Sequence, residues 1–194
     1  PPQWAQLYRA IELHAKWVHA EAAHSLQTGG HGNHFLQKGT ALVLAGTLFP
    51  EFKEAAQWLR TGRQVVADQL RKEIKADGGS IEASPSYSHF IAGLYLAARL
   101  ALAANGQPPL PGLDASVLRQ YRFLAATQSP SGKSLQVGDS YALDARKDLE
   151  IAGRLLGTRF KPRADSVCLA PSRIAFLEHR KVTACLELFE PTCG

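Results

Sequence analysis

Apolar residues recur at helical spacing along residues 1–165 of this 194-residue chain. Between residues 3 and 27 an apolar side chain returns every three or four positions, as in a helix with one buried face. The same pattern predicts further helices over residues 33–49, 50–76, 85–104, 114–127 and 143–156. Short turns separate them, and helices joined by short turns pack antiparallel. We therefore predict an all-α domain of antiparallel helical hairpins over residues 1–165.

Several helix starts carry their own signals. Asn33 is expected to cap the second helix, and Ser84 the fourth, with Pro85 at its first helical position. Pro50 suits the first turn of the third helix. Gly62 lies in the middle of that helix and is expected to weaken it, because glycine loses more backbone freedom in a helix than other residues do.

Residues 166–194 show a different pattern. An apolar run over residues 174–177 and partial alternation over 182–188 predict two strands that form a hairpin. A lone hairpin is marginal in water, so this segment looks like a linker and the opening of a β domain whose remainder is absent. The three cysteines, Cys168, Cys185 and Cys193, lie here without a CxxC spacing. Neither a zinc site nor a disulfide framework is indicated, and a single bridge stays open.

The composition favours an anionic partner. The net charge is +5 and the isoelectric point is near 9.3. The basic residues are interleaved with acidic ones, without a basic arm or an aromatic-basic motif, so nucleic acid is not predicted as a partner. No apolar run approaches the ~20 residues that a membrane-spanning helix needs, so membrane insertion is not predicted either.

Two polar loops carry the candidate chemistry. The first loop, residues 29–34, contains glycines, the side-chain amide of Asn33 and the imidazole ring of His34. The second, residues 77–89, ends with Tyr87 and His89 in the first turn of a helix. Tyr87 could transfer a proton if neighbouring charge lowered its pKa. A purely structural interpretation is also open, with Asn33 as a helix cap, His34 on the surface and Tyr87 as a half-buried aromatic.

The topology suggests that these two loops share one face. Alternate helices of an up-down array point the same way, so the N-termini of the second and fourth helices lie together. Asn33, His34, Tyr87 and His89 would then converge beside the positive ends of two helix dipoles, where a carboxylate or oxyanion is favoured.

No metal or cofactor is predicted for this chain. His31 and His34 could bind zinc with a third ligand, but neither an HExxH motif nor a nearby cysteine accompanies them. No phosphate-binding glycine motif and no GxSxG elbow is present. The turn at Gly138, Asp139 and Ser140 is expected to cap the last helix through Asp139 or to tie loops together.

The ordered set of motifs resembles the heparinase II/III-like polysaccharide lyases, which include oligoalginate lyases and heparin lyase III. The matching segments run in the same order from about residue 10 to residue 145: residues 32–36, residues 45–52, Trp58, residues 77–87 and residues 137–140. The resemblance implies an (α/α) toroid followed by an antiparallel β-sandwich. It also implies cleavage of uronic-acid polysaccharides by β-elimination.

The resemblance extends to single residues. Asn33 matches the asparagine that neutralises the uronate carboxylate, and Tyr87 matches the tyrosine that acts as general acid and base. His34 matches a histidine that assists in alginate-cleaving members. Substrate contacts are expected from His31, Glu82 and His89. Glu82 also matches a loop-ordering position, and His89 lies one residue later than the histidine of many relatives.

The resemblance also shapes the expectations for the whole molecule. In relatives the toroid has further upstream helices, and the sandwich supplies another catalytic histidine and often a structural metal. We therefore expect the helical part of a larger enzyme or a shortened relative, with a partner domain or oligomer covering exposed apolar surface. An acidic polysaccharide or oligosaccharide is the expected ligand, and a periplasmic or secreted location is implied. The alternatives are a non-catalytic glycan-binding or scaffold domain on this fold and an unrelated helical interaction domain.

Overall fold

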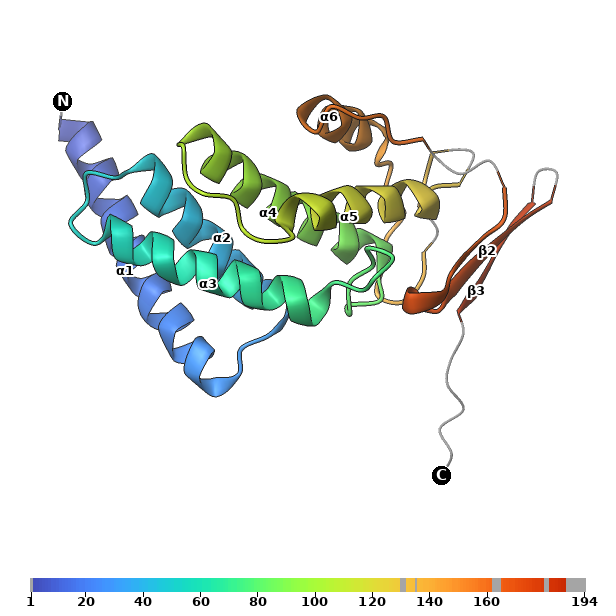
Figure 1. Cartoon of the computed structure of the whole chain (residues 1–194), viewed down its shortest axis with the longest axis horizontal. Coiled ribbons are helices and arrows are strands. Elements are labelled where there is room, and N and C mark those ends of the chain that lie inside the picture. Colours follow the sequence, from blue (N-terminus) through green and yellow to red (C-terminus); the bar gives the residue numbers. More distant parts are fainter. Residues whose placement is uncertain (1, 130–131, 135, 162–164, 180–181, 188–194) are drawn as a thin grey trace. The chain divides into compact units, whose positions relative to one another are not determined.

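The computed structural model describes residues 2–129, 132–134, 136–161, 165–179 and 182–187 (Figure 1). Six α-helices and a three-stranded sheet account for the regular structure of these described residues. The helices are α1 (Pro2–Thr28), α2 (Gly32–Leu48), α3 (Ala55–Glu73), α4 (Pro85–Ala104), α5 (Leu113–Thr127) and α6 (Arg146–Leu155). The strands are β1 (Val167–Leu169), β2 (Ile174–His179) and β3 (Val182–Glu187), with the short 3-10 helix η1 (Ala170–Ser172) between the first two.

The fold class is the predicted one, a mainly helical chain that ends in a small antiparallel sheet. The predicted hairpin is present as β2 and β3, in which Phe176 pairs with Cys185. The sheet also contains β1, which the sequence pattern did not indicate, and β1 pairs antiparallel with β2. Cys168 is an exposed free thiol and Cys185 is half-buried in β3, whereas Cys193 lies outside the described residues.

Two helices begin later than predicted. Pro50 does not start α3, because the chain turns at Phe49, whose carbonyl accepts the Phe52 N–H at 3.3 Å. That turn lets both phenylalanine rings approach Tyr8, with centroids 5.9 and 5.7 Å away. The last helix begins at Arg146 instead of residue 143, because residue 143 pairs with Ser134 through two hydrogen bonds of 2.8 and 3.0 Å.

The chain divides into two compact units. The first unit comprises the residues up to Glu73 together with Gly93–Asp114, and the second comprises Ile74–Ala92 together with the residues from Ala115 onward. Helix α4 thus begins in the second unit and ends in the first. The domain boundary near residue 165, expected from the sequence, stays a prediction.

Close packing of α2 against α3 builds the core of the first unit (Figure 1). Trp58 and Val65 of α3 and Leu42 of α2 are almost fully buried there. The backbones approach at Gly39 and Gly62: a Cβ atom added at Gly62 would lie 2.7 Å from the Gly39 carbonyl oxygen. Gly62, expected to weaken its helix, is therefore the residue that lets the two helices pack closely.

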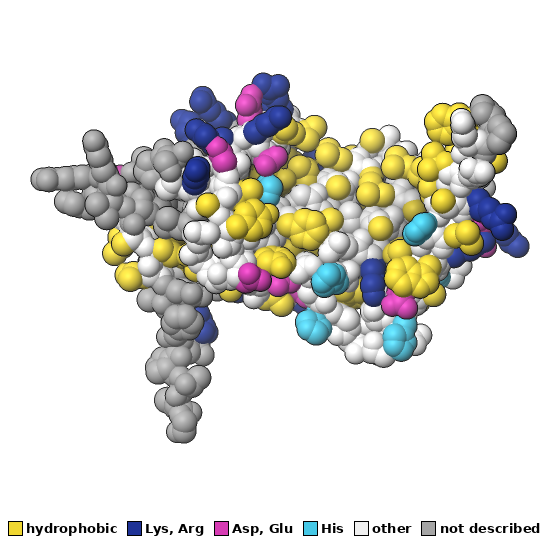
Figure 2. All heavy atoms as spheres, turned by 180° about the vertical axis from the view of Figure 1, so that it is seen from behind, with side chains coloured by type: hydrophobic (Ala, Val, Ile, Leu, Met, Phe, Trp, Pro, Cys, Tyr) yellow, Lys and Arg dark blue, Asp and Glu magenta, His cyan; other side chains and the backbone are white. Residues whose placement is uncertain are grey.

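Part of α1 in the first unit presents apolar side chains to solvent. Trp4, Leu13 and Trp17 are each more than half exposed. A separate cavity of about 400 Å³ is lined by residues of α1 and α2 that include Ile11, Val18 and Ala45. Apolar side chains are also plentiful on the face drawn in Figure 2. Leu13 and Trp17, one turn apart, share one side of α1, whereas Trp4 projects from the side opposite to Leu13.

Helix α4 is long and apolar enough to cross a membrane by length and composition alone, with a mean hydropathy of 1.2 over an 18-residue window. Core helices of soluble proteins meet the same criterion, so the observation is weak evidence for a membrane span. Ile91, Tyr95 and Ala98 of this helix are buried inside the protein.

In the second unit the sheet is fastened to the helical part through one carboxylate. Asp77 Oδ2 accepts the Ser172 N–H at 2.8 Å, and Asp77 Oδ1 accepts the Ser172 hydroxyl at 2.9 Å and the Gly79 N–H at 3.0 Å. Phe123 of α5 packs with Ile174 and Phe176 of β2 in a buried cluster. These contacts support a sheet that would be marginal alone.

We expect Gly62→Ala to destabilise the chain by about 1–3 kcal/mol, because the new methyl group would collide with the α2 backbone. The matched control is Gly93→Ala in α4, where nothing lies within 4 Å of the added Cβ atom. That change should stabilise the chain by up to about 1 kcal/mol through higher helix propensity. Urea unfolding of both variants measures the difference, and equal effects would contradict the close-packing argument.

Candidate active site

The first candidate segment is the turn that leads into α2. His31 occupies the N-cap position of α2 without a side-chain cap hydrogen bond. The carboxylate of Glu73, at the end of α3, accepts the Gly32 N–H instead. Glu73 is only 3% exposed. The prediction that Asn33 caps this helix is therefore wrong, because a buried carboxylate from another helix already occupies that place.

Asn33 lies in the first turn of α2, half-buried, between the exposed rings of His31 and His34. Its Oδ1 accepts a hydrogen bond from Gln37 Nε2 at 3.2 Å, one turn further along. That contact fixes which end of the amide faces the helix. The sequence-predicted residues His31, Asn33 and His34 thus share one short segment of the first unit.

Buried polar groups of the first unit hold this turn in place. Gln69 Nε2 donates to the Gly30 carbonyl at 3.4 Å, and the Gly30 N–H donates to the Ser25 carbonyl at 2.7 Å. Burial raises the pKa of Tyr95 well above its usual value, and the negative charges of Glu73 and Asp68 add to this. Tyr95 therefore stays protonated at neutral pH.

The second candidate segment is the start of α4. Ser84 precedes Pro85, the first residue of α4, and its Oγ accepts the Tyr87 N–H at 3.4 Å. The predicted cap is thereby confirmed. The Ser84 hydroxyl also donates to the Asp139 carbonyl at 2.8 Å. The start of α4 is thus tied to the turn at residues 138–140. This agrees with one of the two predictions for that turn, namely that it ties loops together.

Three serine hydroxyls form a directed chain at this junction. Because Ser84 gives its proton to Asp139, Ser86 must be the donor in the 3.1 Å contact between Ser84 and Ser86. Ser140 in turn donates to Ser86 Oγ at 3.2 Å and accepts the Ser86 N–H at 3.2 Å. Such coupled bonds polarise one another and fix the loop beside Tyr87.

Tyr87 faces a cavity of about 310 Å³ in the second unit. Ser86, Phe90, Asp139 and Tyr141 complete its lining. Phe90 is 41% exposed and Tyr141 61%, so two aromatic side chains border the opening. Apolar ring surface next to a few fixed polar groups is the usual make-up of a small-molecule site.

His89 and Glu82 are not among the lining residues of that cavity. His89 Nε2 lies 3.2 Å from Asp148 Oδ2 at α6. Glu82 is half-buried in the turn before Ser84. Their roles in substrate binding stay predictions. The convergence of Asn33 and His34 with Tyr87 and His89 also stays a prediction, because the two pairs belong to different units.

The sequence did not single out the aromatic residues that border the cavity. Phe90 appears only as an apolar position of α4, and Tyr141 follows the turn that the motif search identified. Tyr141 directly follows the predicted turn at Gly138, Asp139 and Ser140, and this position in the sequence could have identified it as a candidate site residue. Among the described residues there is no group of three or more His, Cys, Asp or Glu side chains arranged to hold a metal ion.

Comparison with known proteins decides the family. The model of the family "Heparinase II/III N-terminus" matches residues 6–150. This chain belongs to the heparinase II/III family. Over 90 residues it is 37% identical to the heparin-sulfate lyase of Bacteroides thetaiotaomicron, an alignment that covers 46% of this chain and 13% of that protein. Over 77 residues it is 34% identical to the heparin-sulfate lyase of Bacteroides stercoris, with 40% and 11% covered.

Solved structures of this family share the fold. A crystal structure of heparinase III superposes with a TM-score of 0.77 and 18% identity, over 96% of this chain and 33% of that one. The heparan sulfate lyase HepC of Pedobacter heparinus gives a TM-score of 0.65 and 20% identity, over 89% and 29%. The helices therefore have the fold of part of the toroid seen in these structures. The alignments span a third or less of the length of these relatives.

We expect Glu73→Ala to lower the free energy of unfolding by about 1–3 kcal/mol, because the Gly32 N–H loses its buried acceptor. Glu73→Gln keeps an acceptor and should cost less. Urea unfolding measures both. An alanine variant as stable as the wild type would show that Glu73 does not cap α2.

We expect Ser84→Ala to cost about 1–2 kcal/mol, because one hydroxyl serves both as the cap of α4 and as the donor to Asp139. Hydrogen exchange of the Tyr87 amide should speed up in the variant, since its acceptor is removed. An unchanged exchange rate at this amide would contradict the capping assignment.

Proposed function

We propose that this chain supplies the helical part of a polysaccharide lyase that cleaves a uronic-acid-containing acidic polysaccharide by β-elimination. The observation that carries the proposal is the cavity beside Tyr87, in a chain of the heparinase II/III family. Its curated relatives are named heparin-sulfate lyases. A net charge of +5 suits a polyanionic substrate.

Tyr87 is the proposed general base and general acid. Its oxygen, deprotonated before the step, removes the C5 proton of the uronate, the C5 electron pair forms the C4–C5 double bond, and the C4–O bond breaks. The hydroxyl formed in this way then gives that proton to the departing glycosidic oxygen. The hydroxyl chain from Ser140 through Ser86 to Ser84 fits this role, since it fixes the helix turn that carries Tyr87.

Asn33 is the proposed partner of the uronate carboxylate. Donors that neutralise this group stabilise the negative charge that develops as the C5 proton leaves. His34, the next residue on α2, is proposed to assist. His31, Glu82 and His89 are proposed as further contacts to the glycan.

Exposed apolar side chains of α1 suggest a protein contact. Leu13 and Trp17, which lie one turn apart on one side of α1, would be covered by a partner domain or by another copy of the chain. Because the enzyme would act on an extracellular polymer, we also propose a periplasmic or secreted location.

The test follows the ultraviolet absorbance of the unsaturated uronate during incubation with heparan sulfate, heparin, alginate or hyaluronan. It uses this chain and the full-length gene product that contains it. We expect Tyr87→Phe to lower the rate by at least about 100-fold, because the proton-transferring oxygen is lost. Tyr141→Phe is the matched control: it removes a hydroxyl from the same cavity and should retain most of the activity.

Three outcomes can be told apart. Product formation that depends on Tyr87 but not on the Tyr141 hydroxyl supports the proposal and identifies the substrate. Binding of a glycan without any product, in the full-length protein as well, would favour a non-catalytic glycan-binding domain. Product formation that survives Tyr87→Phe would rule out the assigned acid-base role.

A further inference from the structure

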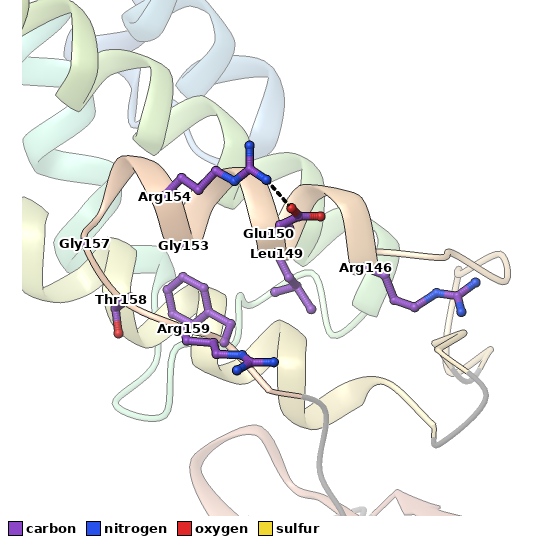
Figure 3. A pocket seen from close by; sticks show the side chains of 9 residues that line it. Arg146, Leu149, Glu150, Gly153, Arg154, Gly157, Thr158 and Arg159 are labelled. Atoms are coloured by element: carbon purple, nitrogen blue, oxygen red, sulfur yellow. Dashed lines mark hydrogen bonds and ion pairs between the residues drawn. The ribbon is translucent and has the colours of Figure 1, made fainter.

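A second hollow lies along α6. It measures about 780 Å³ and is formed by α6 and the segment that follows it (Figure 3). Its lining combines Leu149, Gly153 and Phe160 with three arginines, Arg146, Arg154 and Arg159, and one acidic residue, Glu150. It has no residue in common with the cavity beside Tyr87.

Two of the three guanidinium groups are already paired. Arg154 donates to Glu150 one turn earlier, at 2.5 Å, a pair that is drawn in Figure 3. Arg146 pairs with the carboxylate of Asp144. Hydrogen bonds from Arg146 lower the pKa of Asp144 to about 2, so that carboxylate stays ionised at neutral pH. The charges of Arg146 and Arg154 are therefore largely compensated.

Arg159 is different. No ion pair or hydrogen bond joins its guanidinium to any side chain of the described residues. Figure 3 shows Arg159 and Leu149 directed toward the same space beneath α6, whereas Arg154 and Glu150 pair along the helix. The hollow thus contains one uncompensated positive charge on a partly apolar floor.

The backbone on both sides of Arg159 is fixed. Gly157 adopts a φ of +63°, and the Thr158 N–H donates to the Gly153 carbonyl at 2.9 Å, which closes the end of α6 in a Schellman turn. On the other side the Phe160 ring lies 5.6 Å from the Tyr121 ring. Burial raises the pKa of Tyr121 to about 12, as expected for a well-packed anchor. Arg159 is therefore presented on a rigid turn.

We propose that the α6 hollow is a subsite for an acidic glycan, in which Arg159 binds a sulfate or carboxylate group of the sugar chain. A guanidinium presents two parallel N–H groups that match either anion. The carbonyls at the end of α6 repel an anion, so binding there depends on the arginine charge. Phe160, which is half-buried, offers apolar surface to the sugar ring. The proposal rests on the proposed function for its ligand class.

The test measures the affinity of the chain for two short oligosaccharides by calorimetry, one from heparan sulfate and one an unsulfated glucuronate-containing chain. All measurements use the Tyr87→Phe background, so that cleavage does not consume the ligand. We expect Arg159→Gln to weaken binding about fivefold at low salt, and less at high salt. Arg9→Gln is the matched control, because Arg9 is an exposed arginine of α1 in the first unit.

A loss of affinity confined to Arg159→Gln supports the subsite, and the oligosaccharide that shows the larger loss identifies sulfate or carboxylate as the bound group. Equal losses in Arg9→Gln and Arg159→Gln would overturn it, because they would reflect net charge alone. No loss in Arg159→Gln, or no binding of either oligosaccharide, would also overturn it. Arg159-dependent binding by a protein that never forms unsaturated product would leave the subsite standing while the lyase proposal fails.

Discussion

The N–H groups at the starts of α2 and α4 need acceptors, and the two candidate site segments depend on how that need is met. Four N–H groups of a helix's first turn have no partner within the helix. At α2 the acceptor is the buried carboxylate of Glu73, which comes from α3. At α4 it is Ser84, whose own proton goes to the Asp139 carbonyl. Asn33 is therefore not used as the cap of α2, and Tyr87 is held on a turn that two loops fix together.

Much of the fold was predictable, because it follows from local patterns. The apolar period gives six helices, and the Ser84-Pro85 pair marks the first residue of α4. The failures arise where a distant contact overrides a local preference. Asn33 is a good cap by itself, but Glu73 lies 41 residues away from Gly32 in sequence. Gly62 is poor for an isolated helix, yet the approach of α2 requires it. The short strand β1 forms because it pairs with β2, and three residues carry too little pattern to reveal that.

For the candidate site, the sequence predicted Asn33, His34 and Tyr87 through a resemblance of ordered motifs. The family membership is established, and the roles of these residues stay predictions. The lining of the Tyr87 cavity could not be read in the same way. Ser86 and Ser140 are 54 residues apart in sequence, and no spacing rule connects them. The aromatic border formed by Phe90 and Tyr141 likewise arises from a helix and a loop that only the folded chain brings to one opening.

The net charge of the chain illustrates why composition alone cannot identify the place where an anionic ligand binds. The excess of five positive charges is spread along the sequence, and several of the positive side chains are paired with a carboxylate three or four residues away, as Arg71 and Lys72 are with Asp68. An exposed pair of this kind contributes little to stability and offers little to an anion. A positively charged side chain indicates an anion-binding site when it lines a hollow, lies on a rigid turn and has no compensating carboxylate. Arg159 meets these three conditions. The affinity of this chain for anions is therefore better predicted from its uncompensated positive charges than from its net charge.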